Sequence, residues 1–138
     1  MAAVFDAPGR FAALRLGPGD DLRAGLEAAR GDDAAVAVAT CVGSLTEAMI
    51  RHADRDEATA YRGRYEIVSL TGTLGPDGPH LHMAIADGAG RAVGGHVMPG
   101  CRVYTTAEVV LIRLDGLAFR RAPCARSGYR ELLIERLP

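Results

Sequence analysis

Three clusters of turn-forming residues divide the middle of the chain and constrain its fold more than any other feature. They occupy residues 75–79, 87–90 and 99–100. Gly and Pro interrupt regular structure, and Asp-Gly favours the positive φ angles of a hairpin turn. The segments beside these clusters carry apolar residues that alternate with polar ones, as along a half-buried strand. The chain is therefore predicted to fold mainly as antiparallel hairpins.

The same patterns predict the individual elements. Asp21 follows a turn and can cap a helix in which Leu22, Leu26 and Ala29 share one face, with Gly31 as its stop. Residues 42–52 fit either a second helix or a strand, and residues 53–62 are expected to form a loop. Strands are predicted over residues 11–16, 34–41, 64–74, 80–86, 92–98, 103–114 and 132–137. The expected fold class is α+β: one domain over residues 1–138, mostly antiparallel sheet with one or two helices.

Composition narrows the possible functions. The formal net charge is −1, and aromatic residues make up 5% of the chain. A protein that binds a phosphate backbone on its own is usually strongly basic, and base stacking needs aromatic side chains, so direct DNA binding is not favoured. The three cysteines form no Cys-x-x-Cys pair, which indicates a reducing compartment. With no long apolar run or signal peptide, we expect a cytoplasmic protein without a membrane segment.

Three histidines are the main candidates for a functional site. His80 and His82 start a predicted strand, where the period of two places both side chains on one face. His96 lies on the returning strand. A two-residue turn would point His96 to the opposite face, whereas a turn of three or five residues, or a bulge at Gly94-Gly95, would bring it beside the pair. We predict that His80, His82 and His96 converge on a metal ion.

Three imidazoles leave a fourth position on zinc open, which is typical of a reactive or ligand-binding site. Zinc is the expected cofactor, although imidazole also suits copper, nickel and iron. The fourth histidine, His52, lies among charged residues and is expected to be solvated. Glu66 and Glu108, on predicted strands, are candidates for acid–base roles near the metal but are expected to face solvent or pair with arginines.

Several motifs resemble the plants-and-prokaryotes-conserved (PPC) domain. The resemblance runs from about residue 10 to residue 114. Its motifs stand at residues 14–22, Val42-Gly43-Ser44-Leu45, residues 63–72, His80-Leu81-His82, Asp87, Gly90 and Gly94-Gly95-His96. Plant members of the family usually have Phe at the position of Tyr65, whereas the histidines look like the prokaryotic form.

The resemblance implies an α+β domain that assembles as a homotrimer, with His80, His82 and His96 as ligands of a metal, expected to be zinc. Plant members attach the domain to an AT-hook that binds DNA. Arg62-Gly63-Arg64 lacks the proline of such a hook and opens a predicted strand.

Three functions follow as hypotheses. The favoured one is a homotrimeric PPC-type binding or regulatory module with a three-histidine metal site and a possible protein partner. The second is a zinc-dependent enzyme that acts on a small oxygenated molecule. The third is a DNA-binding protein. The sequence leaves open whether the protein is an enzyme, and which substrate it would take.

Overall fold

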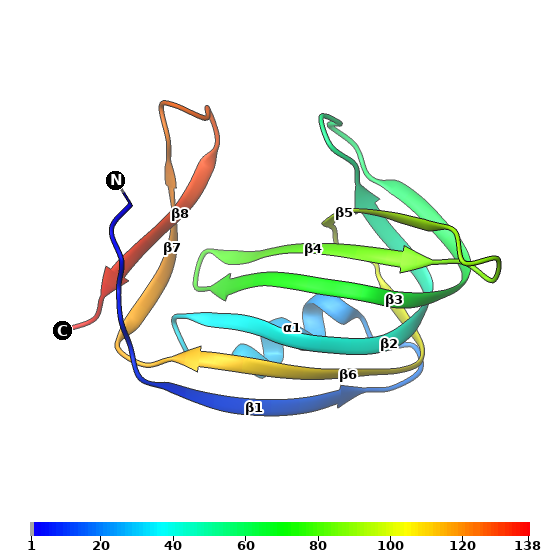
Figure 1. Ribbon diagram of the computed structural model, residues 1–138, viewed down its shortest axis with the longest axis horizontal. Helices are drawn as coiled ribbons and strands as arrows, with labels where there is room; N and C mark the ends of the chain where they lie inside the picture. Colours follow the sequence, from blue (N-terminus) through cyan, green and yellow to red (C-terminus); the bar gives the residue numbers. More distant parts are fainter. Residues whose placement is uncertain (1) are drawn as a thin grey trace.

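A six-stranded sheet with the order β1-β6-β2-β3-β4-β5 dominates the computed structural model, which describes residues 2–138 (Figure 1). All of its paired neighbours are antiparallel. The strands are β1 (Gly9–Leu16), β2 (Val36–Arg51), β3 (Thr59–Gly75), β4 (Gly78–Ala86), β5 (Ala92–Val97) and β6 (Arg102–Leu114). The end of β2 also pairs with β5, through Ile50 with Val97 and Arg51 with His96. This second pairing curls the sheet and brings β5 back to β2.

The single described helix, α1 (Leu22–Arg30), packs its apolar side on the sheet. The Asp21 carboxylate accepts a hydrogen bond from the backbone N–H of Ala24, which is the expected N-cap. The chain leaves the helix at Gly31, whose φ of 59° favours glycine. Leu22 and Leu26 are fully buried. No helix in residues 2–138 has the length and apolar character needed to cross a membrane.

The main core lies between α1 and the inner side of the curled sheet. Its largest fully buried side chains include Leu22, Leu26, Leu45, Ile50, Leu74, Leu81, Ile85 and Leu111. A second, smaller cluster joins Ala35, Leu117 and Phe119 to half-buried neighbours that include Phe5 and Ile134.

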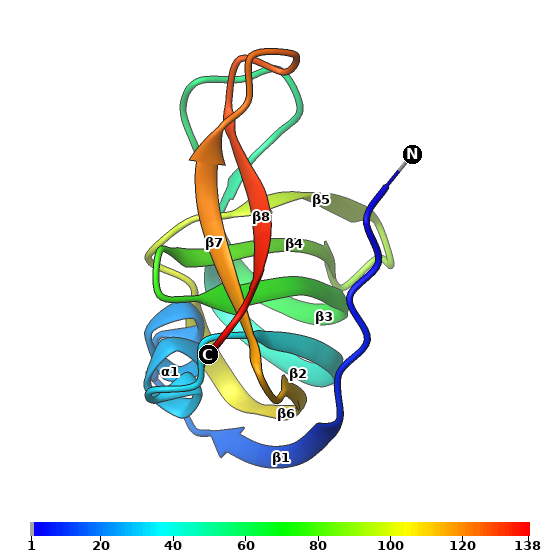
Figure 2. The same ribbon diagram turned by 90° about the vertical axis from the view of Figure 1, so that its left-hand side faces the viewer.

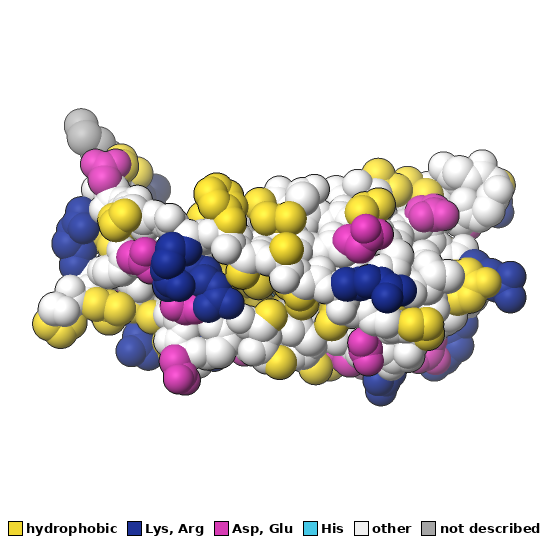
Figure 3. Space-filling view, turned by 90° about the horizontal axis from the view of Figure 1, so that it is seen from below, with side chains coloured by type: hydrophobic (Ala, Val, Ile, Leu, Met, Phe, Trp, Pro, Cys, Tyr) yellow, Lys and Arg dark blue, Asp and Glu magenta, His cyan; other side chains and the backbone are white. Residues whose placement is uncertain are grey.

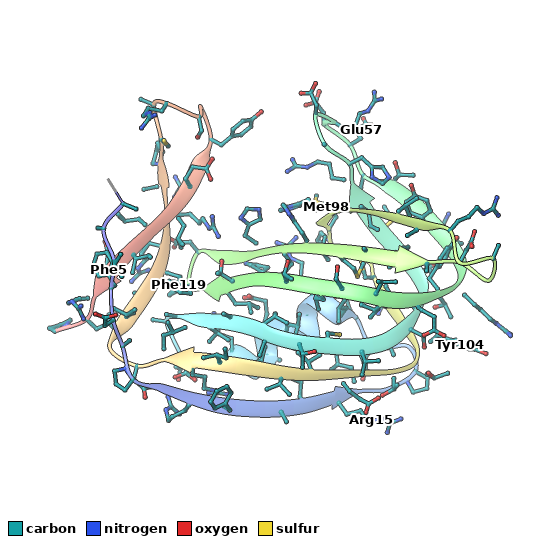
Figure 4. The ribbon with its side chains drawn as sticks, in the orientation of Figure 1. Phe5, Arg15, Glu57, Met98, Tyr104 and Phe119 are labelled. Atoms are coloured by element: carbon teal, nitrogen blue, oxygen red, sulfur yellow. The ribbon has the colours of Figure 1, made fainter. Side chains whose placement is uncertain are left out.

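This second cluster forms the base of a separate hairpin, β7 (Leu117–Pro123) and β8 (Arg130–Arg136). The hairpin rises away from the sheet (Figures 1 and 2), and Phe5 and Phe119 lie near its base (Figure 4). The backbone N–H of Phe119 donates to the carbonyl of Ala34, 2.8 Å away, and the Arg121 N–H donates to the Asp77 carboxylate at 2.9 Å. These bonds fix the hairpin to the loops at one end of the sheet.

The predicted class, an α+β domain of mostly antiparallel sheet, is confirmed, with local differences from the predicted elements. Of the two alternatives left open for residues 42–52, the strand is the correct one up to Arg51, because the second half of β2 pairs with β3 and β5. The predicted loop at 53–62 is shorter, since β3 begins at Thr59. A bulge between Ile67 and Ser69 turns Leu70 inward beside Ile67, although strict alternation from Ile67 would place it on the other face. The strand β7 was not predicted.

Candidate metal centre

The three histidines converge on one side of the β4–β5 hairpin. His82 lies directly across from His96, and His80 lies two residues before His82 on the same strand. Ala86 pairs with Ala92, so the connecting loop holds residues 87–91 and has the odd length that brings His96 to the correct face. The Asp87 carboxylate closes this loop by accepting the backbone N–H groups of Ala89 and Arg91, each at 2.9 Å.

The ring spacing suits a shared ion. The ring centroid of His80 lies 5.0 Å from that of His82 and 5.2 Å from that of His96, and the centroids of His82 and His96 are 5.8 Å apart. One nitrogen from each ring lies within 4.8 Å of the others. Nitrogens around tetrahedral zinc are roughly 3.4 Å apart, given Zn–N distances of about 2.1 Å. Small ring rotations close the difference, so the residues present fit a metal ion.

Two glycines let β5 approach its neighbours without a bulge. A Cβ atom on Gly95 would lie 2.6 Å from the carbonyl oxygen of Arg51, and one on Gly94 would lie 2.7 Å from that of Met83. Both distances are too short for a real Cβ. Of the two roles that the sequence left open for this pair, close backbone approach is therefore the correct one, and the β4–β5 register is uninterrupted.

The surroundings keep two of the rings neutral. Burial lowers the pKa of His96 to about 4, and the Arg51 guanidinium adds to this effect. The pKa of His80 is also lowered, first by burial and then by the Arg121 guanidinium and by His82, while Glu131 opposes the change. A neutral imidazole is the form that binds a metal. At neutral pH these rings are therefore ready to act as ligands without first losing a proton.

His52 is not a freely solvated residue, contrary to the prediction. Its Nδ1 lies 2.9 Å from the Gly94 carbonyl oxygen and its Nε2 lies 2.6 Å from the Tyr61 hydroxyl. Because a carbonyl oxygen can only accept, Nδ1 donates its proton, and Nε2 accepts from the tyrosine. His52 thus links Gly94 on β5, two residues before His96, to Tyr61 on β3. This link supports the position of β5.

The histidines line two hollows. On either side of β4 and β5, two segments rise from the sheet (Figure 1). One segment is the β7–β8 hairpin and the other is the β2–β3 connection, whose tip carries Glu57 (Figure 4). On the hairpin side is a cavity of about 460 Å³, lined by Arg51, Asp77, Pro79, His80, His96, Arg121, Tyr129, Arg130 and Glu131. A second hollow of about 400 Å³ reaches the same histidines from the β2–β3 side. The opposite view, from the β1 edge, shows no histidine among the described side chains (Figure 3).

The other candidates lie away from this cavity. Glu66 lines a different hollow with Arg64 and Tyr104, and Glu108 is exposed on β6. The site residues that sequence reasoning missed are Arg51, Arg121, Tyr129, Arg130 and Glu131. The last four belong to the β7–β8 hairpin, and no motif or spacing in the sequence indicates that this hairpin lines a cavity beside the histidines.

Fold and site together define a small antiparallel α+β domain with an open three-histidine cluster of the kind that can hold a transition metal. Residues 5–115 match the Plants and Prokaryotes Conserved (PCC) domain. The chain belongs to this family, which confirms the PPC resemblance of its motifs.

Individual relatives agree with this assignment. A hypothetical protein from Salmonella cholerae-suis is 44% identical with a TM-score of 0.93, and the match covers 96% of this chain and 97% of that one. The metal-containing protein AF0104 from Archaeoglobus fulgidus is 27% identical with a TM-score of 0.79, over 96% and 99% of the two chains. The bifunctional protein GlmU from Synechococcus sp. (strain JA-3-3Ab) is 48% identical over 126 residues, or 90% of this chain. The chain spans 20% of the length of the curated relatives it matches.

Proposed function

We propose that the protein is a metal-binding PCC module in which His80, His82 and His96 hold one zinc ion per chain. The observation that carries this proposal is the convergence of three imidazole nitrogens within 4.8 Å on one side of the hairpin. The lowered pKa values of His80 and His96 favour the neutral, ligating form. The similarity to a protein from Archaeoglobus fulgidus that is described as metal-containing supports it further.

When bound, such an ion supplies a Lewis acid with a position open to the cavity. The chain's own residues contribute the rest. Arg51 and Arg121 keep cationic groups beside the rings, His52 holds β5 in place, and Glu131 provides a carboxylate on the cavity wall.

The test is metal analysis of protein purified without a histidine tag. We expect about one zinc ion per chain, and a loss of most of that metal in His82→Ala, because two imidazoles bind zinc much more weakly than three. Arg126→Gln, in the exposed turn of the β7–β8 hairpin, is the control: Arg126 lines neither hollow beside the histidines, and the variant should keep the metal. Equal metal content in wild type and His82→Ala would show that the ligand assignment is wrong.

A second candidate function, a zinc-dependent enzyme acting on a small oxygenated molecule, is favoured by one specific feature. The cavity beside the histidines also holds the carboxylate of Glu131 and the hydroxyl of Tyr129, either of which can exchange a proton with a bound molecule. Zinc-dependent turnover of a small ester or carbonyl compound would distinguish an enzyme from a binding module.

We further propose that the module assembles as a homotrimer, and that it serves a regulatory protein partner. The exposed apolar side chains of Phe11, Val42 and Val68 on β1, β2 and β3 support self-association. DNA binding is the weakest of the three functions, because the net charge is −1 and Arg62-Gly63-Arg64 lies within β3.

A further inference from the structure

We propose that the cavity beside the histidines binds the carboxylate or phosphate group of a small molecule, held by Arg51, Arg121 and Arg130. This inference deepens the proposed function, because it names the ligand class of the same site and rests on that site being a metal centre. The arginines themselves are not metal ligands, so their role can be tested separately.

The three guanidinium groups reach one cavity from separate elements. Arg51 ends β2, Arg121 lies on β7, and Arg130 begins β8. The cavity holds about 460 Å³, which is the size of a small-molecule site. Its floor is formed by His80 and His96. A bound molecule would therefore contact the arginines on the walls and the histidine cluster beneath.

The guanidinium groups keep donors available for an anion. None of the three forms an ion pair with a carboxylate in residues 2–138, whereas Arg10, Arg30, Arg62, Arg91, Arg113 and Arg120 all do. The bonds they do make are to neutral acceptors. Arg121 Nη2 donates to the Thr73 hydroxyl at 3.1 Å, and Arg130 Nη2 donates to the Arg121 carbonyl at 2.6 Å. Each guanidinium has five N–H donors, so these bonds orient the groups and leave most donors free.

The acids of the cavity do not cancel this charge. Asp77 and Glu131 are the two carboxylates on its wall. Asp77 already accepts the Arg121 backbone N–H at 2.9 Å and lies 3.8 Å from Arg120, which is not a lining residue. Glu131 alone faces three arginines. A metal ion on the histidines would make the cavity more positive still, so an oxyanion is the complementary ligand.

Most of the charged residues of this cavity lie outside the part of the chain that matches the family. Arg121, Arg130 and Glu131 lie beyond residues 5–115, the part that matches the PCC domain. Two of the three arginines, Arg121 and Arg130, are therefore supplied by the β7–β8 hairpin, whereas Arg51 belongs to the matched domain. Ligand choice is expected to depend on this hairpin, while metal binding depends on the β4–β5 hairpin.

The experiment is isothermal titration calorimetry on zinc-loaded and on chelator-treated protein. Lactate and lactamide are the matched probes, because they differ in charge but not in shape, and inorganic phosphate is the third. We expect lactate or phosphate to bind at least tenfold more tightly than lactamide, because one charge-assisted hydrogen bond contributes roughly that much to affinity. Whichever anion binds more tightly indicates whether the natural ligand carries a carboxylate or a phosphate.

The variants assign the effect to the cavity. Arg121→Gln and Arg51→Gln should each weaken anion binding by about tenfold. They lie on different elements, β2 and β7. Arg51→Gln therefore still tests the cavity if loss of the Arg121–Thr73 bond loosens the hairpin. Arg126→Gln, in the exposed turn of the same hairpin, is the control and should bind as the wild type does.

Two results would overturn the proposal. One is equal affinity for lactate, phosphate and lactamide, including no binding of any of them at millimolar concentration. The other is anion binding that neither arginine substitution weakens, which would mean that the metal alone holds the anion. Failure of the metal site looks different: the protein would carry no zinc, yet its chelator-treated form would still prefer the anions through Arg51 and Arg121.

Discussion

At the scale of single residues, charged groups near the histidine cluster affect the pKa values of its rings. Arg51 pairs with His96 across β2 and β5, and its guanidinium is one reason why the pKa of that ring falls to about 4. The same guanidinium lines the cavity. One residue thus adds to the lowering of the pKa of a proposed ligand ring and supplies a cation to the cavity in which we propose that an anion binds. The protein obtains two electrostatic effects from a single register position.

The neutral state of His96 predicts a pH dependence of stability. In the unfolded chain this histidine gains a proton near its ordinary pKa of 6.5, whereas in the folded chain it does so near 4. Between these values the unfolded state binds more protons, so the free energy of unfolding falls as the pH drops from 6.5 towards 4. Urea unfolding of metal-free protein should show this fall, and His96→Asn, which cannot titrate, should show a shallower one. Parallel profiles for the two proteins would contradict the assignment.

Sequence reasoning could place His80 and His82 on one face but could not fix His96. The strand period of two depends only on neighbouring residues, so it is visible in the sequence. The position of His96 depends on whether the loop holds two residues, or three or five, and on whether Gly94-Gly95 forms a bulge; Asp-Gly is compatible with each of these loops. The loop holds residues 87–91. The backbone N–H groups of Ala89 and Arg91 donate to the Asp87 carboxylate and stabilise this longer loop, and these bonds are seen only in three dimensions.

At the scale of elements, the β7–β8 hairpin is held mainly through its base. Phe119 is only 9% exposed and packs with Ala35 and Leu117, while Gly75 lets the hairpin backbone approach so closely that a Cβ there would lie 2.1 Å from the Phe119 carbonyl oxygen. The upper part of the hairpin, with Tyr129 and Arg130, is exposed. The cavity wall therefore depends on a small apolar anchor at its lower end.

We predict that Phe119→Ala loosens this hairpin. Removing a buried phenylalanine costs roughly 3–5 kcal/mol, and here the loss falls on the anchor. Trypsin cleavage at Arg126, in the exposed turn, should become at least about tenfold faster, because local opening becomes more frequent. Leu133→Ala is the matched control: Leu133 is 45% exposed on β8, and its loss should change the cleavage rate by less than about twofold. Similar rates in the two variants would show that the hairpin is held elsewhere.

Whole elements could be predicted from the sequence where nearby residues define them, and could not where pairing with distant strands determines the secondary structure. The cap at Asp21 and the stop at Gly31 define α1 from nearby residues alone. The second half of β2 carries Leu45, Ala48 and Met49 at spacings that also suit a helix, and only its partners β3 and β5 make it a strand. The strand β7 likewise depends on its pairing, because its partner β8 begins only after an intervening turn.

At the scale of the whole molecule, the face of the sheet turned away from α1 carries the proposed self-association surface. Phe11, Val42 and Val68 are 75%, 59% and 59% exposed, although side chains of their size are usually buried when they lie on a sheet. They come from β1, β2 and β3, which belong to one continuous sheet. Apolar side chains spread over one sheet face are suited to packing against another copy of the chain.

A charge placed on this face should therefore break the proposed homotrimer. We expect the wild type to elute in size-exclusion chromatography with light scattering as three chains of 14.5 kDa each, and Val42→Glu or Val68→Glu to elute as a single chain. A carboxylate forced into an apolar interface loses its hydration without gaining a partner, which opposes assembly. Val4→Glu is the control, because Val4 is 83% exposed and precedes β1, outside the strands of the sheet. A monomeric wild type, or a trimer that survives both substitutions, would place the interface elsewhere or remove it.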